Sequence, residues 1–225
     1  MPFFLGTFIG MCIIGCVGFT RRDWLAELAI AVVFIGFPFV LLISWDLLIY
    51  FHPFTVDPWL YRADRALGLD DFTFIHFTYA RPALVWILSA VYYGLPVILA
   101  LAWVIERSTL LLRSAVIAAV AAYLFYNLVP AVGPVHALAW DAPHTLLSNT
   151  TFDHVPRNCF PSMHFGWALL VALNAKSWPW RTFAWPFALL TAMATIGSGE
   201  HYFVDLIAAV PFCLGVQIFS ARTWS

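Results

Sequence analysis

The chain has 225 residues, of which 63% are hydrophobic and 10% are charged, and its mean hydropathy is +0.86. This composition excludes an ordinary water-soluble domain and favours a membrane protein. The formal net charge of -1 leaves no broad basic surface, so we expect no nucleic acid among its partners.

Seven apolar runs approach the length of about 20 residues that a membrane-spanning helix needs. They are residues Phe3 to Phe19, Glu27 to Phe51, Leu84 to Ile105, Leu110 to Pro130, Ser162 to Ala175, Thr182 to Ser198 and His201 to Phe219. The fifth run is the shortest. The first has no basic residue before it, with Arg21 and Arg22 after it, which favours a retained anchor over a signal peptide. We predict an all-α polytopic membrane helical bundle with a six-helix core and one additional N-terminal span.

No repeat, low-complexity tract or soluble linker interrupts the chain, so residues 1–225 are expected to form a single membrane domain. We divide it into N-terminal spans (1–51), an interfacial segment (52–83) and a catalytic core (84–225).

The interfacial segment contains the pattern of a short helix. Asp57 is a candidate cap, Pro58 suits the first helical position and Gly68 suits the stop. The predicted apolar stripe of this helix is Trp59, Leu60, Ala63 and Leu67. We expect the helix to lie in the membrane interface, and we assign Asp57 and Asp64 a structural role.

Basic residues in alternate loops predict the orientation, because cytoplasmic loops are enriched in lysine and arginine. One set of loops holds seven of them: Arg21, Arg22, Arg107, Arg113, Lys176, Arg181 and Arg222. The other set holds four: Arg62, Arg65, Arg81 and Arg157. This bias places the segments 52–83 and 131–162, together with the turn at 199–201, on the periplasmic or luminal side.

The strongest chemical signal is the sequence Gly199-Glu200-His201-Tyr202-Phe203-Val204-Asp205. A spacing of four puts His201 and Asp205 on one helical face, about 5–6 Å apart between Cβ atoms. The carboxylate can then hold one imidazole nitrogen as N–H and leave the other as a nucleophile. The plain alternative is a capping pair at the start of a helix. Ionisable groups at membrane depth favour function.

A second signal, Arg157-Asn158-Cys159-Phe160-Pro161-Ser162-Met163-His164, precedes another apolar run. Ser162 marks a helix start, where unpaired backbone N–H groups bind phosphate. Arg157 supplies a bidentate grip, and His164 is placed to protonate a leaving oxygen. One span inward and one outward return the two motifs to the same membrane face. We therefore predict phosphoryl transfer through a phosphohistidine, with no metal and no cofactor.

Other polar residues carry weaker signals. The loop containing His136, His144 and His154 has no ligand spacing typical of a metal site. The four cysteines form no zinc-spaced cluster, and Cys12 and Cys16, four apart in an apolar run, are expected to act as small buried hydrophobic residues. Tyr92, Tyr93 and Tyr126 are expected to pack between helices, with lining of the substrate cavity as their alternative.

At these motifs the chain resembles the type-2 phosphatidic acid phosphatase superfamily, whose Pro-Ser-Gly-His and His-x3-Asp sequences correspond to Pro161–His164 and His201–Asp205. The resemblance implies that His201 is the nucleophile, Asp205 its orienting partner and His164 the acid. It departs at three positions: Met163 replaces the glycine, Thr195 stands where an arginine is expected, and Tyr126-x6-Gly133-Pro134 replaces Lys-x6-Arg-Pro.

These departures resemble the branch that contains the inositol phosphorylceramide synthases, which transfer a head group between lipids. On that reading, Arg157 and His136 supply the replacement charge for phosphate, with Ser162 beside them. The expected substrate is a lipid phosphate or phosphodiester, drawn from membrane lipids. The acceptor, water or an alcohol, and the oligomeric state stay open. A transporter or lipid-binding protein with the histidines as proton relays is the rival prediction.

Overall fold

The structure is a computed structural model that describes residues 2–21, 50–52, 54–139, 145–147 and 155–222. These residues form helices and no named strand, with one isolated bridge between Leu138 and Leu146. The helices are α1 (Pro2–Arg21), α3 (Asp57–Ala66), α4 (Asp71–Tyr79), α5 (Pro82–Glu106), α6 (Thr109–Leu128), α7 (Pro134–Ala137), α8 (Met163–Asn174), α9 (Trp178–Gly197) and α10 (Phe203–Arg222). The predicted all-α fold class is confirmed.

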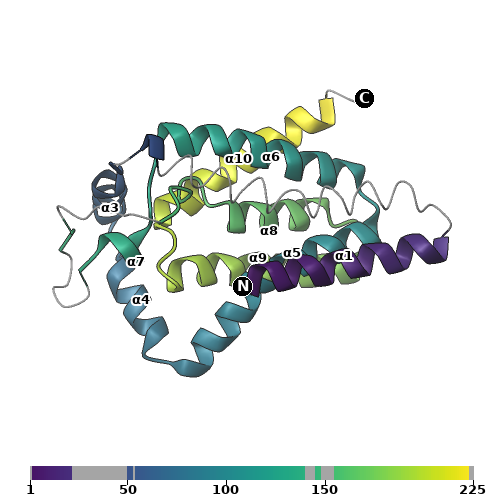
Figure 1. The fold of residues 1–225 in the computed structure, drawn as a ribbon, viewed down its shortest axis with the longest axis horizontal. Helices are drawn as coiled ribbons and strands as arrows, with labels where there is room; N and C mark the ends of the chain where they lie inside the picture. Colours follow the sequence, from purple (N-terminus) through teal and green to yellow (C-terminus); the bar gives the residue numbers. More distant parts are fainter. Residues whose placement is uncertain (1, 22–49, 53, 140–144, 148–154, 223–225) are drawn as a thin grey trace.

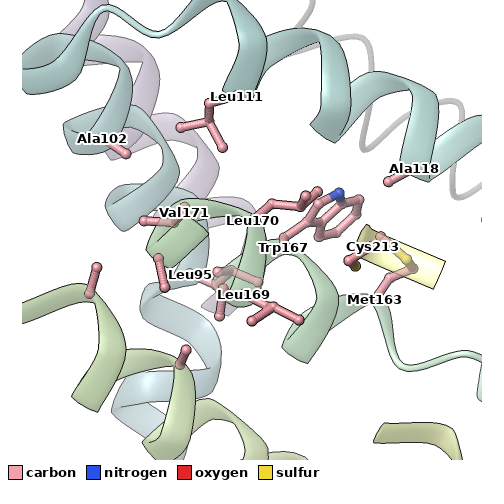
Figure 2. Close-up of a cluster of buried hydrophobic side chains, with 14 of the residues drawn as sticks. Leu95, Ala102, Leu111, Ala118, Met163, Trp167, Leu169, Leu170, Val171 and Cys213 are labelled. Carbon is pink, nitrogen blue, oxygen red and sulfur yellow. The ribbon is translucent and has the colours of Figure 1, made fainter. Parts of the chain in front are cut away.

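Helix α8 is the centre of the bundle. It packs against α5, α6, α9 and α10, while α1 lies along the outside of α5 (Figure 1). Its Trp167, Leu170 and Val171 side chains are buried in the main hydrophobic cluster, and Cys213 of α10 lies close to Met163 (Figure 2). A helix that is apolar around its whole circumference must be covered on all sides, and α8 is covered in this way.

The outer surface of the bundle is apolar. Trp86, Val120, Leu189 and Ile218 are among the large hydrophobic side chains that it exposes. Three helices, α5, α6 and α10, are long and apolar enough to cross a membrane. An apolar exterior on such helices suits lipid as the solvent, and the chain is a membrane protein.

The predicted apolar runs agree with the helices where both are described. The run Glu27 to Phe51 lies almost wholly outside the described residues. The short fifth run is the 12-residue helix α8. One prediction is wrong in register: the last helix begins at Phe203 instead of His201, so His201 precedes the helix.

Helices α3, α4 and α7 gather at one end of the molecule (Figure 1). Helix α3 ends as predicted, before Gly68, whose φ of +76° favours glycine. Of the predicted apolar stripe, Leu60 is buried against the protein, whereas Trp59 and Leu67 are exposed on its surface. Asp57 is the first helical residue and makes no cap of α3. Helix α4 was not predicted. Its signal was Asp70, which caps it by accepting from Thr73 N–H.

Candidate active site

His201 lies in the turn between α9 and α10. Its backbone N–H donates to Thr195 O at 3.3 Å, which ties the turn to the end of α9. Gly199 has a φ of +78°, and a Cβ there would meet Val135 Cβ at 2.8 Å, so this position requires glycine. The turn therefore has a fixed shape, and it places the His201 side chain in the interior, where it is 4% exposed.

Two acceptors hold the Nδ1 atom of His201. The backbone oxygen of Cys159 lies 2.8 Å away, and Asp205 Oδ2 lies 3.4 Å away. Because both neighbours accept, Nδ1 is the nitrogen that carries the proton. Asp205 was predicted as the orienting partner, but the Cys159 carbonyl is the shorter contact. Nε2 is left as the unprotonated nitrogen, which is what a nucleophilic histidine needs.

Asp205 is fully buried and held by donors from two segments. Its Oδ2 accepts from Tyr202 N–H at 2.7 Å and from the Cys159 thiol at 2.8 Å. Burial and the Asp205 carboxylate raise the pKa of the Cys159 thiol well above its usual range, so the thiol keeps its proton and donates. The carboxylate is thereby fixed beside the imidazole. The sequence had given no indication that Cys159 contributes to the site.

His164 is the second residue of α8, and its ring stacks on Tyr92 of α5. The ring centroids are 3.9 Å apart and the planes meet at 16°. The backbone N–H of Ser162, two residues before His164, donates to Asp205 O at 3.2 Å, so the start of α8 lies against the segment that carries His201 and Asp205. The two predicted histidines therefore lie in one site. The stacking partner was not predicted, although Tyr92 had been considered as a residue of the cavity.

Ser162 directly precedes α8, at its N-cap position, and its side chain is fully buried. Its backbone N–H donates to Asp205 O at 3.2 Å, which joins the starts of α8 and α10. Its hydroxyl Oγ has no hydrogen-bond partner among the described residues. A buried hydroxyl without a partner costs free energy, and at the start of a helix it is placed to bind an anionic oxygen.

Arg157 and His136 occupy different surroundings. Arg157 is 1% exposed, and its guanidinium donates to the backbone oxygens of His52 and Val155. His52 in turn contacts Asn127 near the end of α6, at 3.3 Å between Nε2 and Oδ1. His136 is half-buried on α7. No described contact joins its ring to His164 or His201.

The structure shows the surroundings of Gly133 and Thr195, two positions at which the resemblance led us to expect arginine. Gly133 has a φ of +91°, and a Cβ at this position would lie 2.4 Å from Glu200 O. Because that neighbour is backbone, an arginine cannot stand here without moving the His201 turn. Thr195 is fully buried and its hydroxyl donates to Ala192 O within α9. Neither position supplies positive charge.

Two aspartates of α3 accept hydrogen bonds from the segments that carry the site. Asp57 accepts from the backbone N–H of Val132 and Gly133 at 2.9–3.2 Å, and from the Tyr202 hydroxyl at 3.0 Å. Asp64 accepts from Phe203 N–H at 2.6 Å and Val204 N–H at 2.8 Å, and so caps α10 from another helix. These contacts agree with the predicted structural role of both residues.

Cys159, His201 and Asp205 also offer three possible metal-ligand atoms within 4.8 Å of one another. Their Sγ, Nδ1 and Oδ2 atoms are already joined by hydrogen bonds to each other or to backbone. The three side chains therefore form a hydrogen-bonded cluster, in which the Cys159 thiol donates to the Asp205 carboxylate.

The fold and the site together define a class: an all-α membrane protein in which two histidines and a carboxylate converge at one end of the bundle. A family model described as the PAP2 superfamily matches residues 58–219, which is more than half of the chain. The chain belongs to the PAP2 superfamily. Its members are generally phosphatases, and membership supports a phosphatase-type activity on a lipid phosphate. Neither a search of curated proteins nor a search of solved structures found a match.

Proposed function

We propose that the protein is a membrane phosphatase or phosphotransferase that acts on a lipid phosphate ester through a phosphohistidine at His201. The observation that carries this proposal is the pair of acceptors at 2.8 and 3.4 Å from Nδ1. They fix the tautomer in which Nε2 has a lone pair to attack phosphorus.

The reaction has two displacements at phosphorus. In the first, His201 Nε2 forms a bond to phosphorus, the bond to the lipid alkoxide breaks, and His164 gives its proton to the leaving oxygen. In the second, His164 takes a proton from the acceptor hydroxyl, whose oxygen bonds to phosphorus as the N–P bond breaks. After the second step His164 carries a proton again, and His201 Nε2 has its lone pair back.

Phosphate binding relies on fixed dipoles more than on cations. The N-terminal amides of α8 and the Ser162 hydroxyl face the start of the helix, where the helix dipole favours anions. Arg157 adds a buried positive charge on the same loop as the motif, and His136 is the remaining candidate. The cluster uses no metal, so the activity is expected to survive chelation.

An inositol phosphorylceramide synthase-like head-group transferase is the second candidate. The lack of a positive charge at Gly133 and Thr195 favours this candidate. A phosphodiester carries less negative charge than a phosphomonoester and therefore needs fewer cations around it. A transporter or lipid-binding protein is the alternative outside the enzymes. We place the site on the periplasmic or luminal side, from the excess of basic residues in the opposite loops.

Turnover over a panel of lipid phosphates and phosphodiesters tests the proposal, with released phosphate and transferred head group both measured. We expect one of these products from the wild type and a loss of at least about 100-fold in His201→Ala and His164→Ala. His76→Ala, which removes an exposed histidine of α4, is the matched control and should retain activity. Lipid binding without any turnover would favour the transporter or lipid-binding alternative.

A further inference from the structure

A small cavity lies beside the two catalytic histidines, between α4, α5 and α9. Its walls include Tyr79, Tyr92, Tyr93 and Glu200. Tyr92 stacks on His164, and Glu200 directly precedes His201. Two residues of its lining thus adjoin the two histidines, and the proposed mechanism has not used the cavity.

Three tyrosine rings and one carboxylate gather in this cavity. Tyr92 and Tyr93 meet edge to face, with centroids 5.3 Å apart and planes at 85°. Both Tyr79 and Tyr92 are within electrostatic range of Glu200 and of Tyr93. The Tyr79 hydroxyl donates to Ser198 O at 3.4 Å, which ties α4 to the end of α9.

The lining is acidic as well as aromatic. No lysine, arginine or histidine is among the residues that line the cavity, and Glu200 forms no ion pair with any described residue. Arg81 follows Tyr79 by two positions, but its guanidinium lies 3.7 Å from the centre of the Phe77 ring and donates to Phe77 O. An anionic group would meet an unscreened carboxylate here, whereas a cation would be attracted by it.

The volume of the cavity limits the size of the cation that it can hold. The cavity volume is about 60 Å³, and a water molecule requires roughly 10–15 Å³ of such space. The cavity thus admits on the order of four non-hydrogen atoms. A trimethylammonium group has that size, whereas a sugar or inositol ring is much larger. Aromatic rings with a carboxylate are also the surroundings in which proteins bind alkylammonium ions.

We propose that this tyrosine–glutamate cavity binds the ammonium group of a zwitterionic phospholipid, while the phosphate of the same head group sits at His201. The inference rests on the proposed function and narrows its substrate to a phosphodiester with an alkylammonium head. In the first displacement the P–O bond on the glyceride side breaks, and His164 protonates that oxygen. The head group stays on His201 until water or an alcohol takes it.

Ligand binding without turnover tests the cavity separately from the chemistry. Full-length His201→Ala protein in a maltoside detergent is probed with tetramethylammonium by saturation-transfer NMR. We expect a signal that choline displaces, and an affinity about tenfold weaker when Glu200→Gln is added. Glu106→Gln, at the opposite end of α5, is the matched control and should bind as well as its parent. Absence of a tetramethylammonium signal in the His201→Ala protein would overturn the inference.

A pair of isosteric lipids gives the second measurement. We expect the wild type to use phosphatidylcholine at about ten times the kcat/KM of the analogue with an uncharged 3,3-dimethylbutyl head. Tyr93→Phe keeps the ring and should keep this ratio, whereas Tyr93→Leu should lower it. An equal kcat/KM for the two lipids contradicts the inference. If His201 still became phosphorylated from phosphatidic acid, the proposed function would stand alone.

Discussion

At the residue scale, Cys159 joins the two halves of the catalytic pair. Its carbonyl accepts from His201 Nδ1 and its thiol donates to Asp205 Oδ2. Orientation of the imidazole thus depends on the backbone of the Arg157–His164 segment as much as on the carboxylate. One motif holds the nucleophile of the other in position.

Replacement of the Cys159 thiol tests this arrangement. Cys159→Ser keeps a donor and should retain most of the activity, whereas Cys159→Ala leaves Asp205 with one donor fewer. We expect kcat to fall about tenfold in Cys159→Ala, from the usual cost of a lost hydrogen bond to a buried charge. Steady-state kinetics with the best lipid of the panel provide the measurement. Equal kcat values in the two variants would remove Cys159 from the positioning role.

The buried carboxyl group of Asp71 makes the stability of the folded protein depend on pH. The group is fully buried, and burial followed by the nearby Asp64 carboxylate raises its pKa to about 8. Below its unfolded-state pKa the group is protonated in both states and costs nothing. As the pH rises from about 4 to about 8, only the unfolded state loses its proton, so stability falls across this window and levels off above it.

The Asp71 effect is measurable as a thermal midpoint in detergent at a series of pH values. Asp71→Asn should flatten the decline between pH 4 and 8, because the amide cannot ionise. The groups that face Asp71 are Asp64 and, at longer range, Asp205 and Tyr61. A wild-type midpoint that rises through this window would contradict the assignment.

At the scale of elements, α3 acts as a support for the start of α10. Asp64 caps α10 through Phe203 and Val204, next to the turn that carries His201. Asp70 caps α4 in the same way, through Thr73, but away from that turn. The two aspartates form a natural pair for comparison.

Loss of either cap should cost about 1 kcal/mol of stability. We expect Asp64→Ala also to lower kcat by about tenfold or more, because the His201–Asp205 turn loses its anchor, while Asp70→Ala keeps kcat. Unfolding in detergent and turnover are measured on both variants. If the kcat of Asp64→Ala equals that of Asp70→Ala, α3 has no positioning role.

The sequence predicted the elements whose signals are local. We could predict the long apolar helices α5, α6 and α10 and the end of α3 at Gly68, because hydropathy and turn preferences depend on residues close together in the sequence. The contacts of Asp57, Asp64 and Cys159 were not predicted, because they join segments 41 to 145 positions apart. The start of α10 was misplaced by two residues, since the cap that sets it comes from another helix.

For the whole molecule, the orientation in the membrane remains a prediction. A cysteine introduced at Ala66, an exposed position of α3, reports on the side that carries the site. With Cys12 and Cys16 replaced by serine, an impermeant thiol reagent added to intact cells should label Ala66→Cys. Cys159 is unsuitable as a reporter because it is buried. Labelling of Ala66→Cys only after permeabilisation would reverse the topology.

The central claim for the molecule is a covalent phosphohistidine at His201. Full-length protein is incubated with a lipid carrying labelled phosphorus, quenched in alkali, and split for acid and base treatment. We predict label on the wild type that is lost in acid and retained in base, and no label on His201→Ala. Label that persists in His201→Ala, or a wild type that turns over substrate without ever acquiring label, would contradict the account.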